Sequence, residues 1–252
     1  MSRLFAFRAL LIALAPALAG AQTERDRPAD WTGFYALANA RDLAGTGLKP
    51  VAPGGELSKL IVAHLQPWAI AKMEATDGVA DDPGGVCQAD GIFRYPNFAG
   101  RFLWLPERDR VVMVFGEINT AGVRRIYLDR EHPKNLLPTW NGHSIGHWEH
   151  DSLIVDTVGF NDKSWLMTGR EPHTEETHLM ERIRRVADGA FIEIVGVVED
   201  RHALTSAYTY TRYYKKQNAE PGENVCSEDL DIWRKWRNEA LKKQYDRAKQ
   251  VK

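Results

Sequence analysis

The chain lacks three features that define specialised classes of protein. It has two cysteines in 252 residues, too few for a small domain held together by disulfides. It has no excess of charge, with 33 Lys and Arg against 34 Asp and Glu, which excludes a strongly basic nucleic-acid binder. Its 20 Gly and 12 Pro are too few for a collagen-like or linker sequence. Hydrophobic residues make up 44% of the chain, which is typical of a globular protein.

The long apolar run of the sequence lies at its N-terminus. Residues 9–19 follow the basic residues Arg3 and Arg8, and small residues surround position 21. This order is typical of a secretory signal peptide, so residues 1–21 are predicted to be removed and the mature chain to be periplasmic or secreted. The run is shorter than the about 20 residues that a membrane-spanning helix needs. We therefore expect export without a membrane span.

Export affects how the cysteines are interpreted. In an oxidising compartment two lone cysteines most simply pair with each other, which predicts a Cys87–Cys226 disulfide. Such a bond would close a loop of roughly 140 residues and restrict the unfolded chain. A reactive or metal-bound thiol is the alternative, but no C-x-x-C motif supports it.

Hydrophobic spacing divides the mature chain into three regions. Residues 22–100 are predicted as an extended and helical region that packs on the remainder, with a helical pattern over 56–74 that Pro67 ends or kinks. Residues 101–226 are predicted to form strands. Residues 227–252 are predicted as a C-terminal amphipathic helix docked on them, with a membrane-surface helix as the alternative.

Short runs of period-two hydrophobicity, separated by hairpin-length breaks, fill the central region. Helical patterns do not alternate with these runs, which disfavours a parallel α/β sheet. We predict a mainly β fold of seven or eight antiparallel strands in a curled meander or closed, lipocalin-like barrel, because closure hides the sheet edges. The predicted strands are 102–105, 111–115, 123–128, 153–158, 178–186, 191–198 and 207–214.

Three charged side chains lie on apolar strand faces. Arg125, Asp156 and Glu181 each alternate with apolar residues of their own strand. If these faces point into the barrel, two carboxylates and a guanidinium meet in an apolar cavity, where mutual pairing lowers the cost of burial. The same arrangement tunes a general acid or base. A structural ion pair that braces the sheet is the alternative.

The densest polar segment is 139–152, which contains three histidines. Its glycines disfavour a helix, and on a strand His143 and His147 would share one face while His150 would point the other way. A metal-dependent hydrolase with its metal on His143, His147 and Glu149 is the weakest hypothesis, and exposed histidines on a hairpin are the structural alternative. We predict neither a metal nor an organic cofactor.

This segment also carries a motif. The residues of Gly142-His-Ser-Ile-Gly146, Trp148-Glu149 and Val155-Asp-Thr157, followed by Glu181-Arg182, resemble a family of exported bacterial proteins with the pattern G-H-S-x-G-x-W-E-x-D-[ST]-L-x-V-D-T. The resemblance extends over roughly Cys87 to Glu228 and implies export, but it implies no activity. His150 stands where the family has Gly, and His147 stands at a variable position. Both departures weaken the histidine metal site.

Two functions of different classes follow from these patterns. The first is an exported enzyme that acts on a small apolar or aromatic molecule by cofactor-independent acid–base chemistry, as a lyase, isomerase or hydrolase. Asp156 or Glu181 would be the base, His143 a proton shuttle, and Arg125 the group that stabilises developing negative charge. The second is a non-catalytic periplasmic binder of an apolar ligand.

Both functions need aromatic side chains around a pocket. In either case the expected partner is a small molecule, with no nucleic acid, and the sequence leaves a homo-oligomer open. The candidate substrate-binding residues are Tyr127, Trp140, Trp148, Tyr208 and Tyr210.

Overall fold

The computed structural model describes residues 31–49, 51, 54–98, 100–115, 122–219, 235, 238–243 and 246, with the backbone alone for residues 95–98. The predicted signal peptide and Cys226 lie outside the described residues. Signal cleavage and the Cys87–Cys226 disulfide therefore stay predictions.

The described strands form a closed barrel of nine members, which follow one another around it in chain order. β1 pairs with β9 and closes the ring, and the neighbours are antiparallel except for the parallel pair β4 and β5. The mainly β barrel is confirmed, with more strands than expected and one parallel pair. The strands are β1 (Gly33–Leu37), β2 (Arg101–Pro106), β3 (Arg110–Phe115), β4 (Val123–Leu128), β5 (His143–Glu149), β6 (Ser152–Val158), β7 (His178–Val186), β8 (Phe191–Glu199) and β9 (Tyr208–Gln217).

The barrel is not confined to residues 101–226 as predicted. β1 lies in the region that was expected only to pack on the barrel, and it closes the ring instead. Its five residues carry too little alternation to stand out as a strand in the sequence. β1 is instead stabilised as a strand by its pairing with β2 on one side and with β9 on the other.

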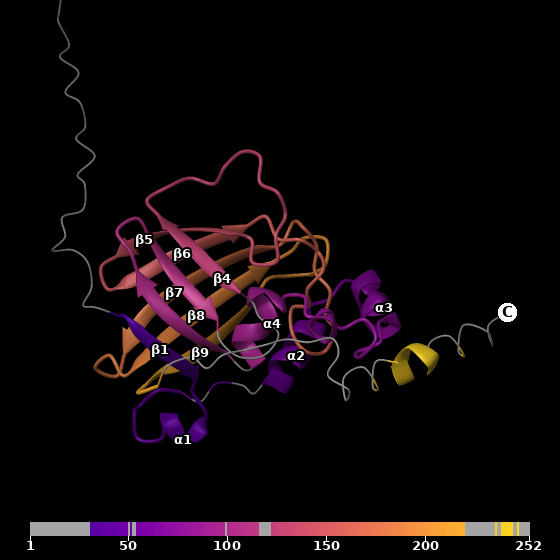
Figure 1. Ribbon diagram of the computed structural model, residues 1–252, viewed down its shortest axis with the longest axis horizontal. Coiled ribbons are helices and arrows are strands. Elements are labelled where there is room, and N and C mark those ends of the chain that lie inside the picture. The colour runs from indigo at the N-terminus through magenta and orange to yellow at the C-terminus, as the bar shows by residue number, and fades with distance from the viewer. Residues whose placement is uncertain are drawn as a thin grey trace, which may run out of the picture.

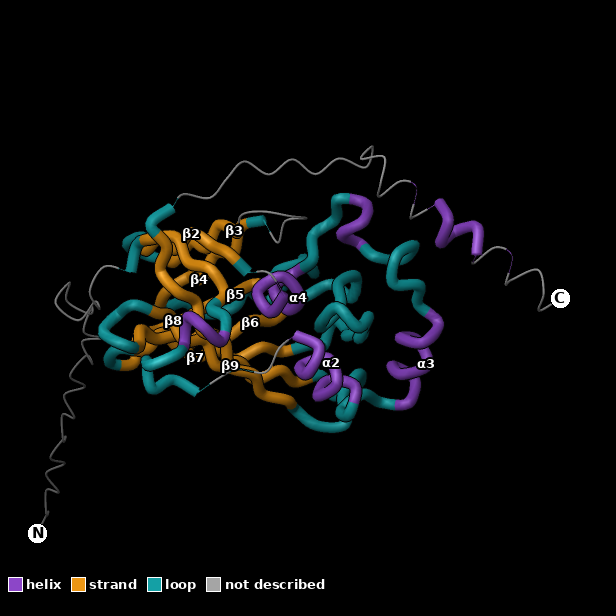
Figure 2. Tube along the Cα trace, turned by 90° about the horizontal axis from the view of Figure 1, so that it is seen from below, coloured by secondary structure: helices purple, strands orange, loops and turns teal. Residues whose placement is uncertain are grey.

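The helices are short, and three of them gather at one end of the barrel (Figure 1). They are α1 (Ala40–Leu43), α2 (Gly54–Val62), α3 (Pro67–Ala75), the 3-10 helix Pro83–Val86 and α4 (Gly91–Phe98). α2, α3 and α4 gather at the same end of the barrel (Figures 1 and 2). The predicted break near Gln66 is confirmed, since Gln66 is the N-cap of α3 and Pro67 takes the first helical position, where no N–H is needed.

The barrel interior is filled by large side chains. Residues of every second position along the strands point inward, and the resulting cluster extends to the helices gathered at one end. Gly196 permits one of these contacts, because a Cβ there would lie 2.4 Å from the Tyr210 ring. Large inward side chains that are at most 2% exposed include Tyr35, Phe102, Trp104, Met113, Ile126, Leu153 and Tyr214.

The C-terminal region is described only in part. Residues 235, 238–243 and 246 are helical, and the docking of a helix over 227–252 on the barrel stays a prediction. Among the described residues, no helix combines the length and the apolar character that crossing a membrane requires.

Candidate functional site

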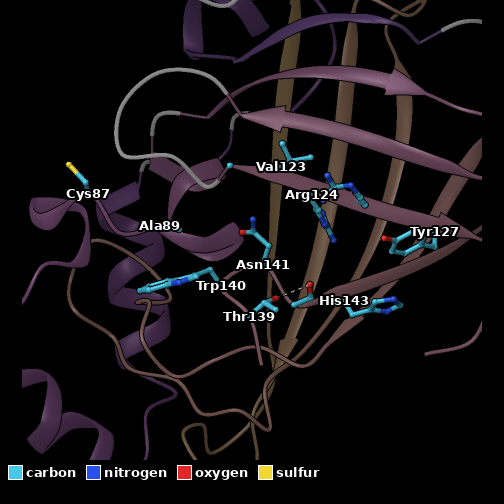
Figure 3. Close-up of a pocket in the computed structure, with 12 residues that line it drawn as sticks. Cys87, Ala89, Val123, Arg124, Tyr127, Thr139, Trp140, Asn141 and His143 are labelled. Atoms are coloured by element: carbon cyan, nitrogen blue, oxygen red, sulfur yellow. Dashed lines mark hydrogen bonds between the residues drawn. The ribbon is translucent and has the colours of Figure 1, made fainter. Parts of the chain in front are cut away.

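The parallel pair β4 and β5 forms the shortest seam of the barrel. Parallel neighbours need a return connection, here residues 129–142, and the two strands pair only over Ile126–Leu128 and Ser144–Gly146. A cavity of about 530 Å³ lies beside this seam. The first residues of β4 and the residues that lead into β5 line it. Figure 3 shows Tyr127 and His143 on one side of this cavity and Cys87 on the other. The lining residues are Cys87, Ala89, Gly122, Val123, Arg124, Arg125, Tyr127, Thr139, Trp140, Asn141, Gly142 and His143.

Gly142 fixes the direction in which the chain enters β5. Its φ is +64°, in the left-handed region, and a Cβ at this position would lie 2.8 Å from the carbonyl oxygen of Val158. A side chain is therefore excluded by both the backbone conformation and the space. This close approach places His143 beside the next strand at the mouth of the cavity.

A row of polar side chains lies on the outer face of the barrel next to the cavity. His132 Nδ1 lies 2.9 Å from His143 Nδ1, and His132 Nε2 lies 3.1 Å from Asp156 Oδ1. His178 Nε2 lies 3.1 Å from the same Asp156 oxygen. The Tyr127 ring stacks on the His143 ring at a centroid distance of 5.2 Å. We call Tyr127, His143, His132, Asp156 and His178 the outer-face row.

The strand register brings the row together. Asp156 pairs with Ile145 of β5 and with Met180 of β7. His143 and His178 lie two residues from these partners on the same outward face, so both are close to the Asp156 side chain. The connection between β4 and β5 folds back and adds His132 between them. Four consecutive strands and one connection thus contribute to the outer-face row.

With both imidazoles neutral, the hydrogen bonds of the row assign its protons. As a carboxylate, Asp156 can only accept, so Nε2 of His132 donates to it. A neutral His132 then has a bare Nδ1, which accepts a hydrogen bond from Nδ1–H of His143. Nε2 of His143 is consequently left as a free lone pair. His143 is thus held in the tautomer that a general base requires.

The electrostatic surroundings favour the neutral form of His143. Burial lowers the pKa of this imidazole below its usual value of 6.5, and repulsion from His132, whenever that ring is protonated, lowers it further. Asp156 is 43% exposed at its side chain, and it accepts hydrogen bonds from two histidines. When His143 takes up a proton, the positive charge is therefore stabilised, through His132, by a carboxylate that is already in place.

The opposite face of the same strands holds a second polar cluster, the interior network of Arg124, Ser144, Thr157 and Glu181. Nε of Arg124 donates to Ser144 Oγ, and its Nη2 donates to Thr157 Oγ1, both at 3.0 Å. Arg124 also forms an ion pair with Glu181. All four residues are at most 5% exposed. Each charge of the network thus has a partner of opposite sign or a hydroxyl, as burial requires.

The predicted inward cluster of Arg125, Asp156 and Glu181 is wrong in two of its three members. Arg125 and Asp156 point outward, and only Glu181 points into the barrel. Arg124, rather than Arg125, is the interior partner of Glu181. β4 and β6 carry apolar or aromatic residues on both faces, so alternation could not decide which face is inside.

Four predicted residues nevertheless meet at the cavity. Arg125, Tyr127, Trp140 and His143 all line it, and Asp156 is connected to His143 through His132. Glu181 is separated from His143 by the barrel wall. The cavity thus joins the predicted shuttle, the predicted cation and two predicted aromatic residues.

The remaining aromatic candidates belong to the barrel core. Trp148 packs against Trp31 at 5.1 Å between ring centroids. Tyr208 and Tyr210 are 4% and 7% exposed inside the barrel. None of these three lines the cavity at the β4–β5 seam.

The histidine set suggested for a metal does not converge. His147 shares the outer face of β5 with His143, but its Nε2 bonds to Glu149 at 3.0 Å, and both partners are more than half exposed. Across the described ranges, no group of three or more His, Cys, Asp or Glu side chains is placed to hold a metal ion.

Sequence reasoning missed His132, His178 and Arg124. His178 begins a predicted strand and alternates against Glu181, so it would have been found once the face of Glu181 was known. His132 lies in an irregular connection, where no periodic signal exists. Arg124 stands beside Arg125, and the local pattern favours neither as the interior residue.

Comparison with known proteins gives no match for this chain, either to a protein-family model or to a curated protein.

Proposed function

We propose that this protein is an acid–base enzyme that acts on a small molecule bound in the cavity at the β4–β5 seam, with His143 as its general base. The observation that carries the proposal is the hydrogen-bonded series from Asp156 through His132 to His143, which lines the cavity. With both imidazoles neutral, this series leaves Nε2 of His143 unprotonated. A carboxylate that orients a histidine is the usual support of such a base.

The lining of the cavity indicates the substrate class. Arg125 contributes positive charge, since Arg124 is already neutralised by Glu181, and no carboxylate is among the lining residues that the structure describes. Trp140, Tyr127 and His143 contribute flat rings. These residues suit a small molecule that combines an aromatic or other flat apolar body with a carbonyl or carboxylate group.

Proton abstraction from carbon follows from this arrangement. Nε2 of His143 takes the proton from a carbon next to a carbonyl, and the electron pair of the broken C–H bond moves onto the carbonyl oxygen, where Arg125 stabilises the charge. In an isomerase the proton returns to a neighbouring carbon. In a lyase the electron pair instead expels a leaving group, which takes up a proton. A hydrolase would use the same base on water.

The cellular location belongs to the same proposal. The N-terminal signal pattern and the resemblance to exported bacterial proteins support action in the periplasm or outside the cell. The chemistry requires no electron donor and no soluble cofactor, which suits either compartment.

The experiment follows exchange and turnover by ¹H NMR in D₂O, using the mature chain and a panel of aromatic 2-hydroxy acids, 3-hydroxy acids, enoic acids and esters. Deuterium incorporation at carbon indicates proton abstraction, while formation of a free acid and alcohol indicates hydrolysis. His143→Gln removes the base. His147→Gln is the matched control, because it changes an exposed histidine of the same strand and face.

Exchange or turnover that His143→Gln abolishes and His147→Gln retains supports the proposal. A compound that binds in the cavity but is neither exchanged nor converted favours the non-catalytic binder instead. Turnover that survives His143→Gln contradicts the assigned base.

A further inference from the structure

A second cavity, of about 550 Å³, lies between Lys49, Val51 and α2 on one side and strands β7, β8 and β9 on the other. It shares no residue with the cavity at the β4–β5 seam. Its volume is in the range of small-molecule sites. Val51, Leu57, Leu60 and Val195 give it an apolar lining, while Thr209, Thr211 and Tyr213 contribute polar side chains.

Arg212 lines this cavity and carries a charge that no described residue neutralises. The residue is 3% exposed, and its Nη1 donates to the Thr211 carbonyl oxygen at 2.9 Å. Its Nη2 is buried without a hydrogen-bond partner among the described residues. A buried guanidinium in this state is costly, and such a group in a native structure calls for a partner such as a bound ion.

The tyrosines around Arg212 do not supply the missing charge. Burial raises the pKa of the Tyr208 and Tyr210 phenols above the usual value of 10.0, so both stay neutral. Burial also lowers the pKa of Arg212 itself, because the charged guanidinium is costly in a buried site without an anion. The local environment is therefore short of one negative charge.

The carboxylates of the cavity are already paired. Glu193 forms its ion pairs with Arg184 and Arg182, and Glu56 is paired with Lys59 at 2.8 Å. Lys49, which also lines the cavity, makes no ion pair with any residue that the structure describes. Arg212 and Lys49 thus remain as two uncompensated cations beside an apolar lining.

We propose that this cavity is a second ligand site, which binds an organic acid with an apolar body and pairs its carboxylate with Arg212 and Lys49. The apolar body lies against Leu57, Leu60 and Val195. Charge-assisted hydrogen bonds from a guanidinium to a carboxylate are among the strong ones, particularly where water is excluded. This site is independent of the acid–base chemistry proposed for His143.

The test is isothermal titration calorimetry of the mature chain with decanoate, and with decanol as the uncharged control of equal length. Arg212→Met removes the charge and keeps an unbranched apolar side chain. Lys49→Gln removes the second cation, and Lys134→Gln makes the same charge change at an exposed position in the connection between β4 and β5, away from the lining. Urea unfolding of each variant without ligand shows whether the fold is kept.

We expect saturable binding of decanoate, with decanol weaker by about tenfold or more. Arg212→Met should weaken decanoate binding by at least about tenfold without lowering stability, since it removes an unpaired buried charge. Lys49→Gln should weaken binding relative to Lys134→Gln, and this comparison serves as the test if Arg212→Met does not fold. Equal binding of decanoate and decanol overturns the proposal. Decanoate binding that is unchanged in Lys49→Gln, and in Arg212→Met where that variant folds, overturns it as well.

Discussion

The strands β4 to β7 carry polar clusters on both of their faces, and the two clusters differ in kind. The interior network is closed, because Arg124 is neutralised by Glu181 and held by two hydroxyls. The outer-face row is open, because its hydrogen bonds end at His143, which lines a cavity. The comparison indicates that burial with a partner braces a barrel, whereas partial exposure with one unused nitrogen leaves a group free to react.

The largest effect should come from breaking the interior network. Glu181→Leu leaves Arg124 charged, buried and without its partner, so the free energy of unfolding should fall by about 3–5 kcal/mol. Urea denaturation measures this loss. The double variant Arg124→Met/Glu181→Leu should recover most of it, because the cluster then becomes apolar. A double variant as unstable as the single one would contradict the structural role of the ion pair.

The same comparison predicts little stability loss on the outer face. His143→Gln should reduce turnover about 10²- to 10⁴-fold, the range that a positioned general base contributes. Its unfolding free energy should change by about 0.5 kcal/mol or less, as for most surface substitutions. Steady-state kinetics and urea denaturation give the two values. Equal loss of activity in His147→Gln would show that the effect is not specific to the outer-face row.

Asp156→Asn sharpens the role of the carboxylate. The amide cannot balance the imidazolium charge, so turnover should fall by about 10- to 100-fold, the loss typical of carboxylates that orient metal-binding histidines. The substitution should act on kcat more than on KM, since Asp156 does not line the cavity. An effect confined to KM would assign Asp156 to substrate binding.

The smallest predicted effect concerns pH. The pKa of His143 is lowered in the folded protein, so the unfolded chain binds more protons at this residue in the range below pH 6.5. Its contribution to stability is therefore complete above pH 6.5 and is lost as the pH falls. Between pH 7 and pH 5, the wild-type protein should lose more stability than His143→Gln, as measured by urea unfolding at both pH values. The opposite difference would mean that His143 is protonated in the fold.

Much of the fold could be predicted from the sequence, because inward positions of the barrel are repeatedly apolar. The strand 178–186 alternates clearly, and the break between two helices at Gln66 follows from a proline. β1 was missed, because a strand of five residues gains its stability from two neighbours and not from its own pattern.

Less of the site could be predicted, because it depends on strand faces and on a return connection. In β6, Ile154 and Val158 on one face are as apolar as Leu153 and Val155 on the other, so the side of Asp156 was undetermined. His143 was recognised by its surroundings in the sequence. Its partner His132 was not, because only the folded connection brings the two imidazoles within 2.9 Å.

The most direct test of the account is the tautomeric state of His143, measured by long-range ¹H–¹⁵N correlation NMR on the mature chain at neutral pH. The outer-face row predicts a neutral imidazole with the proton on Nδ1 and a bare Nε2, with Asp156→Asn disturbing this state and His147→Gln leaving it intact. A proton on Nε2, or a protonated imidazolium at neutral pH, would contradict the assignment of His143 as the general base.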